Sequence, residues 1–318
     1  MQNKIDAINS IKTISILAVV LGHINNPYNN FIYSWHMPFF FLVAGFLFKY
    51  NLSLIEFVKK KFQRLIMPYY IFSFIAVAVE GLKRFILNRP PLQFFEVSKA
   101  IFFDMNQESL SGTYAFALWF LPSLFFSSIL LWILLRYIEN FLIVISIAIG
   151  LFFVGISDNN IPFGIGVSLT TLIWLVIGFY IRRIYASIDG KFNLNLALML
   201  IFLMISILCY DDNFSVDVAN IKYEIDLFWL LYVISFFSFM LIFFSKIYCQ
   251  ENKITSLISD NTMLLFVFHV YTNNIAYFVN VSLGINNFLF SFSLSFALLF
   301  TLIILKRTWP KVRIFKYV

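Results

Sequence analysis

The sequence predicts an all-α fold: a polytopic membrane helical bundle of about ten transmembrane helices with both termini cytoplasmic. Of its 318 residues, 61% are hydrophobic and 12% are charged, whereas soluble domains have about 45–50% apolar and about 25% charged residues. The 42 phenylalanines carry more apolar surface than one soluble core can bury. This composition also excludes a disordered chain, and two cysteines exclude a disulfide-rich secreted scaffold.

Ten apolar stretches predict the individual helices, because about 20 mostly apolar residues cross ~30 Å of hydrocarbon. The predicted spans are 8–25, 31–48, 65–82, 115–135, 141–157, 164–181, 193–210, 227–247, 260–280 and 285–305. No internal repeat and no large hydrophilic segment interrupts this series. Residues 1–318 are therefore expected to form a single integral membrane domain.

Lysine and arginine determine the predicted orientation. With these spans, 18 of the 23 basic residues fall on one side of the membrane. Cytoplasmic loops carry the excess of basic residues, so this side is predicted to be the cytoplasm. The five basic residues on the outer side are Lys83, Arg84, Arg89, Lys99 and Lys222. The net charge of +7 therefore indicates the lipid bilayer as the first partner, and no nucleic acid.

Two outer loops have a distinct character. Residues 91–103 are typical of an amphipathic helix that lies on the membrane surface. The loop near 211–226 is acidic and is expected mainly to solvate the outer surface. Its acidic residues are Asp211, Asp212, Asp217, Glu224 and Asp226.

All three histidines, His23, His36 and His269, fall in or at the edge of apolar spans. Ionisable residues at membrane depth are costly and indicate a functional site, although a neutral imidazole that bonds two helices would be purely structural. Lys12 precedes His23 by 11 residues, which on a helix places both on one face about 16 Å apart. A cation can hold phosphate at one end while an imidazole moves protons at the other. Lys12 could equally extend its amine to the membrane surface.

A second basic cluster, Lys59–Arg64, precedes the third span. It is either a solvated cytoplasmic cluster or a site for the anionic end of a cytosolic donor, since arginine binds phosphate through two hydrogen bonds. These residues alone favour neither interpretation. Three histidines on three spans with few nearby carboxylates make a poor metal site, so no metal is expected.

Five segments in order resemble the integral membrane acyltransferase 3 family. Asn9–His23 is similar to the family's first helix, with a basic residue, ten intervening residues and a histidine. Trp35–Phe46 is similar to the histidine-methionine-proline segment of the second helix, and Arg64–Tyr69 to the start of the third. The likeness continues through Leu118–Pro122 and through Ile258–Met263 to His269. The fucose-4-O-acetylase-like branch is the most similar one.

The chain departs from the family pattern at four positions. Lys12 stands where many relatives have arginine, and Asn9 where aspartate is common. Ala44 replaces a frequent serine before Gly45, so a hydroxyl at that position is not essential here. Phe62 replaces an arginine that many relatives carry two residues before Arg64.

The resemblance implies an O-acyltransferase of the inner (plasma) membrane. Such an enzyme transfers acetyl or another acyl group from cytosolic acyl-CoA to a hydroxyl of a cell-envelope glycan or lipid-linked sugar precursor. Acetyl-CoA is then a donor substrate and not a permanently bound cofactor. The implied roles are chemistry for His23 and His36, donor binding for Lys12, Lys61 and Arg64, and acceptor binding for Trp119 and His269.

Two mechanisms remain open at this stage. Histidine can act as general base on a sugar hydroxyl, which we favour, or it can carry the acyl group covalently. The alternative functions are a polysaccharide flippase or polymerase, and a solute transporter. The acceptor sugar and the oligomeric state are not determined by the sequence.

Overall fold

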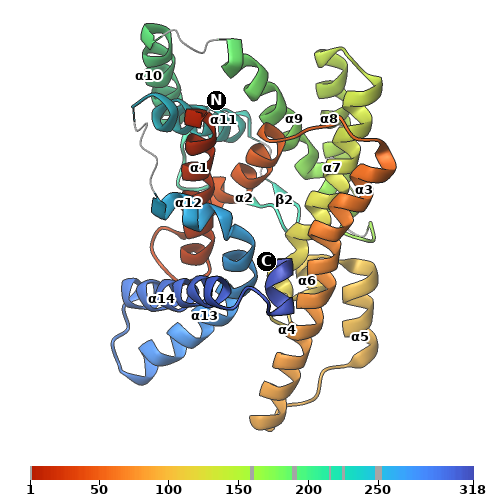
Figure 1. Ribbon diagram of the computed structural model, residues 1–318, viewed down its shortest axis with the longest axis vertical. Helices are drawn as coiled ribbons and strands as arrows, with labels where there is room; N and C mark the ends of the chain where they lie inside the picture. The colour runs from red at the N-terminus through yellow and green to blue at the C-terminus, as the bar shows by residue number, and fades with distance from the viewer. Residues whose placement is uncertain (1, 158–160, 188–191, 215, 224–225, 248–252) are drawn as a thin grey trace.

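The computed structural model describes residues 2–157, 161–187, 192–214, 216–223, 226–247 and 253–318. The long helices (Figure 1) are α1 (Gln2–Gly22), α2 (Asn29–Phe46), α4 (Met67–Ile86), α7 (Phe120–Tyr137), α8 (Phe141–Ser157), α9 (Ile165–Ser187), α10 (Phe192–Cys209), α11 (Leu227–Ile242), α13 (Thr262–Ser282) and α14 (Phe288–Thr308). The short helices are α3 (Leu54–Lys61), α5 (Phe94–Lys99), α6 (Gln107–Leu110) and α12 (Lys253–Asp260). The remaining elements are the π-helical turns η1 (Phe62–Ile66), η2 (Ala100–Asp104) and η4 (Phe243–Ile247), the 3-10 turns η3 (Phe116–Trp119) and η5 (Arg313–Tyr317), and the strands β1 (Val216–Asp217) and β2 (Lys222–Tyr223).

The predicted all-α membrane fold is confirmed, and each of the ten predicted stretches is helical. In the described part of the chain, six helical segments are long and apolar enough to cross a membrane. One of them, Leu54–Ile86, joins α3, η1 and α4 into 33 continuous helical residues. The total of about ten crossings and the cytoplasmic position of both termini stay predictions.

Helices α2 and α9 cross at the centre of the bundle, where two glycines let their backbones meet. A Cβ atom at Gly45 of α2 would overlap the Leu175 carbonyl of α9. A Cβ atom at Gly178 of α9 would likewise overlap the Leu42 carbonyl of α2. Small residues of this kind allow close helix packing within a membrane, where no hydrophobic effect draws helices together. The α2–α9 contact therefore depends on glycine at both positions.

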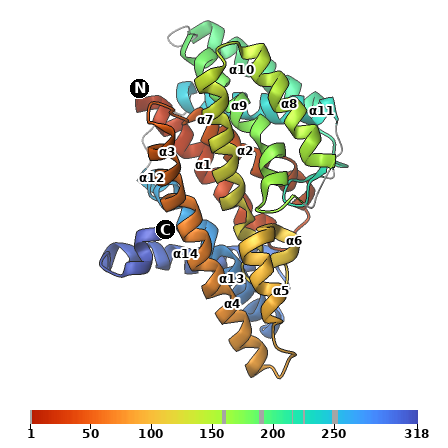
Figure 2. The ribbon, with the colours of Figure 1, turned by 90° about the vertical axis from the view of Figure 1, so that its right-hand side faces the viewer.

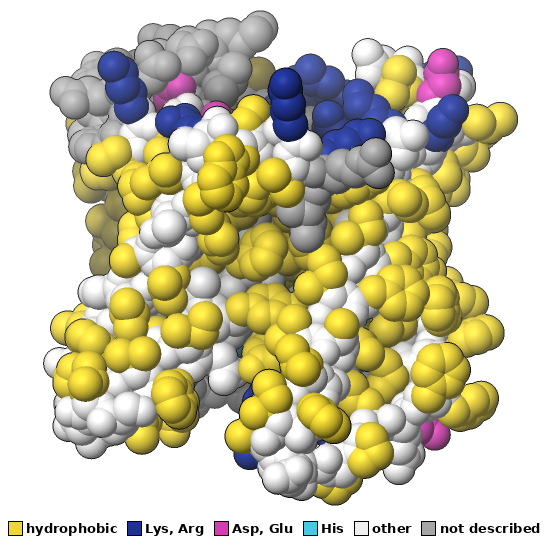
Figure 3. All heavy atoms as spheres, turned by 60° about the horizontal axis from the view of Figure 1, so that its bottom comes forward, with side chains coloured by type: hydrophobic (Ala, Val, Ile, Leu, Met, Phe, Trp, Pro, Cys, Tyr) yellow, Lys and Arg dark blue, Asp and Glu magenta, His cyan; other side chains and the backbone are white. Residues whose placement is uncertain are grey.

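The outer surface is that of a protein in lipid. In Figure 3, apolar side chains cover most of the face shown, and Lys and Arg side chains gather along one edge. Helices at the periphery expose large apolar side chains, among them Phe85, Met204 and Phe278. Such exposure is unfavourable in water and favourable against hydrocarbon.

The segment predicted to lie on the membrane surface, 91–103, forms α5 and η2 and runs alongside α4 (Figures 1 and 2). The hydroxyl of Tyr69 donates to the Ile101 carbonyl at 3.0 Å. The Phe102 ring lies 5.5 Å from that of Tyr70 and 6.0 Å from that of Phe74. The predicted helix is present and packs against α4, and its position on the membrane surface stays a prediction.

The acidic loop near 211–226 folds inward. Strands β1 and β2 pair antiparallel, with Val216 opposite Tyr223, and the Tyr223 hydroxyl donates to Thr170 of α9 at 3.2 Å. The side chains of Val216, Val218 and Ile221 are buried. The expectation of a solvated acidic surface is wrong for the middle of this loop, because its apolar residues pack onto the helices. Glu224 lies outside the described residues.

Candidate functional site

The three histidines come together from distant parts of the sequence. His23 directly follows α1, while His36 lies in α2 and His269 in α13. The ring centroids of His23 and His269 are 4.9 Å apart. Tyr33 lies between His23 and His36. Its ring centroid is 6.4 Å from that of His23 and 5.2 Å from that of His36. Three ionisable rings thus surround one point at the end of α1.

His23 is positioned by hydrogen bonds to the last carbonyls of α1, which have no partner within the helix. The Tyr33 hydroxyl donates to the Gly22 carbonyl at 2.9 Å. The Asn273 amide of α13 donates to the Val20 carbonyl at 2.9 Å, and Ser295 of α14 donates to the Asn273 oxygen at 2.6 Å. Helices α2, α13 and α14 therefore fix the turn that carries His23.

Backbone carbonyls select the tautomers of the other two histidines. His36 Nδ1 lies 2.7 Å from the Ile32 carbonyl, and His269 Nδ1 lies 2.6 Å from the Phe266 carbonyl. A carbonyl only accepts hydrogen bonds, so each Nδ1 carries the proton and each neutral ring keeps a lone pair on Nε2. His36 and His269 are 3% and 0% exposed, and His269 Nε2 is buried without a partner among the described residues. Both rings therefore offer an acceptor nitrogen at the site.

A cavity of about 290 Å³, the histidine cavity, opens beside His23 and His36. Its other polar or aromatic lining residues are Asn30, Tyr33, Gln107, Trp119, Phe214 and Asp217. His23 also lines a second cavity of about 330 Å³, together with Asn25, Asn273 and Asn274. His23 thus lines both cavities.

Asp217 is a site residue that the sequence analysis assigned only to a solvated loop. Its Oδ1 accepts from the backbone N–H groups of Ala219 and Asn220 at 3.1 and 3.2 Å, and its Oδ2 accepts from the Asn220 amide at 2.6 Å. These bonds hold the carboxylate still at the cavity wall. Gln107, Asn30 and Tyr33 were also missed, and Tyr33 alone left a signal, three residues before His36 on one helix.

A basic pocket of about 530 Å³, the lysine pocket, lies between the end of α2 and the α3–η1 segment. Its cations are Lys49, Lys60, Lys61 and Arg64. The Lys61 ammonium donates to Ser128 of α7 at 3.2 Å and lies 5.5 Å from the Phe57 ring centroid. The structure thus brings the predicted donor residues Lys61 and Arg64 together.

A helix cap directs this basic segment. Ser53 and Glu56 form a reciprocal capping box at the start of α3, which satisfies N–H groups that the first turn leaves unpaired. Lys60 and Arg64 then follow four residues apart, on one helical face. The capped helix thereby presents both cations to the lysine pocket.

Lys12 has a different environment. Its ammonium donates to the Ser259 carbonyl at 3.0 Å, and the Ser259 hydroxyl donates to Asn9 at 2.8 Å. Lys306 of α14 donates to Asn261 at 2.8 Å, so this segment joins α1, α12, α13 and α14. Lys12 is not among the residues that line the lysine pocket. Its role in donor binding stays a prediction. The structure shows in addition that Lys12 holds α1 against α12 through the Ser259 carbonyl.

Of the two remaining predicted site residues, Trp119 lines a cavity and His269 does not. Trp119, predicted to bind the acceptor, lines the histidine cavity with His23 and His36. His269 lies behind His23 and does not line that cavity. Within the described residues, no group of three or more His, Cys, Asp or Glu side chains could hold a metal ion.

Comparison with models of known protein families identifies the family of this chain. A family model described as an acyltransferase domain matches residues 5–307, nearly the whole chain. No curated protein and no solved structure matches the sequence. The family match covers all five segments that resemble the family in the sequence analysis. The apolar helices able to span a membrane agree with it. The chain therefore belongs to the acyltransferase 3 family and is a membrane acyltransferase.

Proposed function

We propose that the protein transfers acetyl or a related acyl group from cytosolic acyl-CoA to a hydroxyl of a cell-envelope glycan or lipid-linked sugar precursor. The observation that carries this proposal is that two cavities share one face of α2. Ala44 lines the lysine pocket, and Tyr33 lines the histidine cavity. Eleven residues turn an α-helix about 20° past three full turns and rise about 16.5 Å. One helix face therefore leads from the cations to the histidines.

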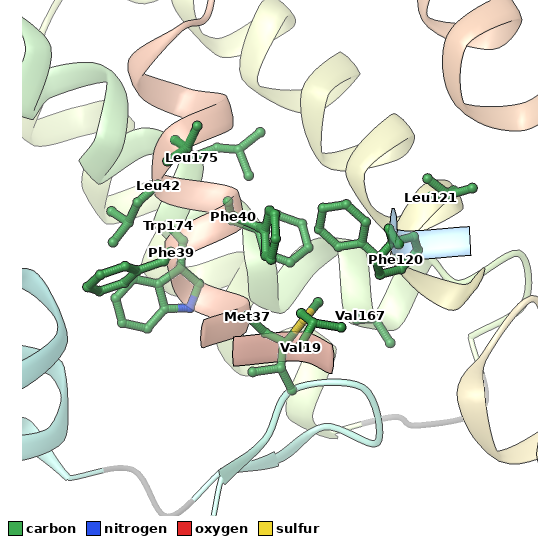
Figure 4. Packing of buried hydrophobic residues seen from close by; sticks show 14 of the residues in the cluster. Val19, Met37, Phe39, Phe40, Leu42, Phe120, Leu121, Val167, Trp174 and Leu175 are labelled. Carbon is green, nitrogen blue, oxygen red and sulfur yellow. The ribbon is translucent and has the colours of Figure 1, made fainter. Parts of the chain in front are cut away.

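The donor fits this spacing. The pantetheine arm of CoA has an extended length on the order of 15–20 Å, close to the rise between Ala44 and Tyr33. With its diphosphate on the lysine pocket, the arm would follow α2 and deliver the thioester beside His23. Between the cavities, Phe40 of α2 packs against Phe120 with ring centroids 5.7 Å apart (Figure 4). The incoming arm would have to displace these rings.

The acceptor would occupy the histidine cavity. Trp119 offers an aromatic face, while Asp217, Gln107 and Asn30 offer hydrogen-bonding groups for hydroxyls. These groups suit a sugar, and the apolar side chains Met37, Phe214, Val216, Val218 and Ala219 complete the cavity wall. With the predicted orientation, this cavity is on the outer side of the plasma membrane, where envelope glycans are found.

The transfer requires one proton acceptor. In this mechanism, His23 takes the proton of the sugar hydroxyl, the oxygen forms a bond to the thioester carbonyl carbon, and the carbon–sulfur bond breaks. The protonated ring then returns its proton to the CoA thiolate. His36 Nε2 is a second lone pair at the cavity and can accept a hydrogen bond from a neighbouring hydroxyl of the sugar. General-base chemistry of this kind contributes typically 10²–10⁴-fold to rate.

His269 is the proposed positioning residue for His23. Its Nε2 accepts hydrogen bonds only, and the His23 ring lies beside it. When it accepts the N–H of His23, the opposite nitrogen of His23 keeps its lone pair toward the acceptor. That lone pair can act as a general base, the route we favour, or as the nucleophile that forms an acyl-histidine. Family membership favours acyl transfer over the flippase, polymerase and transporter alternatives.

The test compares surface glycans from cells that make the wild-type protein or His23→Ala. Mass spectrometry should find acylated sugars with the wild type only, while purified His23→Ala still binds acetyl-CoA. Full glycan acylation by a well-expressed His23→Ala protein would remove His23 from the chemistry. Absence of any acylated glycan with the wild type would contradict the proposed acceptor.

A further inference from the structure

A second basic pocket adjoins the lysine pocket and has no role in the mechanism above. This arginine pocket of about 610 Å³ lies where α2, α7 and α9 end. The residues that line it are Phe48, Lys49, Tyr50, Asn51, Arg136, Phe179, Arg182 and Arg183. It shares Phe48, Lys49 and Asn51 with the lysine pocket. None of the described residues lining either pocket is acidic.

Two cations of the arginine pocket, Arg182 and Arg183, have fixed partners. Arg182 donates to the carbonyls of Phe46 and Phe48 at 3.4 and 3.1 Å, which holds the end of α2 against α9. The Arg183 guanidinium stacks 4.8 Å from the Phe179 ring centroid. Tyr50 adds a second aromatic ring, 6.0 Å from that of Phe179. Planar guanidinium groups beside aromatic faces suit a ligand with both phosphate and a flat ring.

We infer that the arginine pocket binds the nucleoside end of acyl-CoA, with the ribose 3′-phosphate on Arg183 and Arg136 and the adenine against Tyr50. This inference rests on the proposed function. CoA carries two separate anionic groups, the 3′-phosphate and the 5′-diphosphate, and the two adjoining pockets provide two separate groups of cations.

The position of Ala44 on α2 decides which pocket takes the diphosphate of CoA and which takes the nucleoside. Ala44, where the path to His23 begins, lines the lysine pocket and not the arginine pocket. The diphosphate is joined directly to the pantetheine arm, so it belongs in the lysine pocket. The nucleoside then extends away from the path, across the shared Lys49, into the arginine pocket.

An anionic phospholipid is the competing occupant. Basic pockets between helices at the cytoplasmic surface also bind lipid headgroups. Tyr137 and Ile184, next to Arg136 and Arg183, are 76% and 63% exposed, as side chains facing lipid would be. A lipid headgroup has no flat ring to stack on Tyr50, whereas CoA has its adenine, which favours the nucleotide. The experiment separates the two occupants.

The experiment measures binding of CoA and of dephospho-CoA, which lacks only the 3′-phosphate, to the purified protein by calorimetry. The wild type should bind CoA about 10- to 100-fold more tightly, the effect of losing a charge-assisted hydrogen bond. The double variant Arg136→Gln/Arg183→Gln should bind CoA as weakly as dephospho-CoA and leave the dephospho-CoA affinity unchanged. That unchanged affinity shows that the variant is folded.

Two control variants sharpen the result. Arg64→Gln, in the lysine pocket, should weaken both ligands equally. Arg307→Gln removes an exposed cation that lines neither pocket and should change neither affinity. A 3′-phosphate preference that persists in the double variant overturns the inference and leaves the proposed function intact. If the double variant loses co-purified anionic phospholipid while its preference for the 3′-phosphate is unchanged, the inference is also overturned, and the pocket is a lipid site. Absence of CoA binding by the wild type contradicts the proposed function itself.

Discussion

The imidazole rings of His23 and His269 lie 4.9 Å apart, although the residues come from opposite ends of the chain. The backbone carbonyl of Phe266 fixes the proton of His269 on Nδ1. The remaining nitrogen is buried without a partner among the residues that the structure describes. An unpaired buried acceptor is costly, and a hydrogen bond from His23 during the reaction would remove that cost.

This relationship predicts different outcomes for two substitutions at His269. Glutamine can place an oxygen near the position of Nε2 and still accept a hydrogen bond, whereas alanine cannot. We expect His269→Ala to lower turnover about 10-fold, less than the loss from His23→Ala, and His269→Gln to recover part of it. Acyl-transfer kinetics of the variants would check this, and their acetyl-CoA affinity, measured as a control, should equal that of the wild type. Equal rates for both variants would assign His269 a packing role only.

Arg64 and Lys12 should affect different properties. Arg64 is exposed in the lysine pocket, so Arg64→Ala should weaken CoA binding roughly 10- to 100-fold and leave thermal unfolding unchanged. Lys12 holds the Ser259 carbonyl, so Lys12→Ala should lower the Tm of the detergent-solubilised protein. Calorimetry and thermal scans measure the two effects. Unchanged CoA affinity in folded Lys12→Ala would exclude Lys12 from donor binding.

Ala44 tests the path along α2. A phenylalanine there should block the pantetheine arm and lower acyl transfer at least about 10-fold. Binding of 3′,5′-ADP, which has no arm, should not change. Ala44→Ser, which adds only a hydroxyl, is the matched control and should keep near-normal activity. Normal turnover by Ala44→Phe would place the donor path elsewhere.

The crossing of α2 and α9 predicts a large stability effect at Gly178. Because a Cβ atom there would overlap the Leu42 carbonyl, Gly178→Ala should destabilise the protein by roughly 1–3 kcal/mol or more. A Cβ atom at Gly150 of α8 would meet no heavy atom within 4 Å, so Gly150→Ala should be neutral or stabilising by about 0.5–1 kcal/mol. Denaturation of both variants in detergent would compare them. Equal stability would contradict the close crossing.

The predicted orientation can be tested at Asn213, an exposed residue before β1. Cysteine at this position, with Cys209 and Cys249 replaced, should react with a membrane-impermeant thiol reagent in intact cells. The reason is that the excess of Lys and Arg predicts cytoplasmic termini and an outer position for this loop. Labelling only after the cells are broken would reverse the orientation.

The sequence by itself determined the apolar helical stretches and identified most of the candidate site residues. The ten apolar stretches could be predicted because bilayer thickness imposes a minimum length on each helix. His23, His36, Trp119, Lys61 and Arg64 could be selected because charged, polar or motif residues stand out against apolar surroundings. Each of these signals is local in the chain.

The tertiary structure alone decided how distant residues meet. The Lys12–Ser259 bond, the Gly45 and Gly178 crossing and the His23–His269 pair all join segments far apart in sequence. Asp217 reaches the histidine cavity because the apolar residues around it pack onto the helices, although its loop is acidic. Composition and spacing report what each helix contains, whereas helix packing, governed by shape and backbone approach, decides which faces come together.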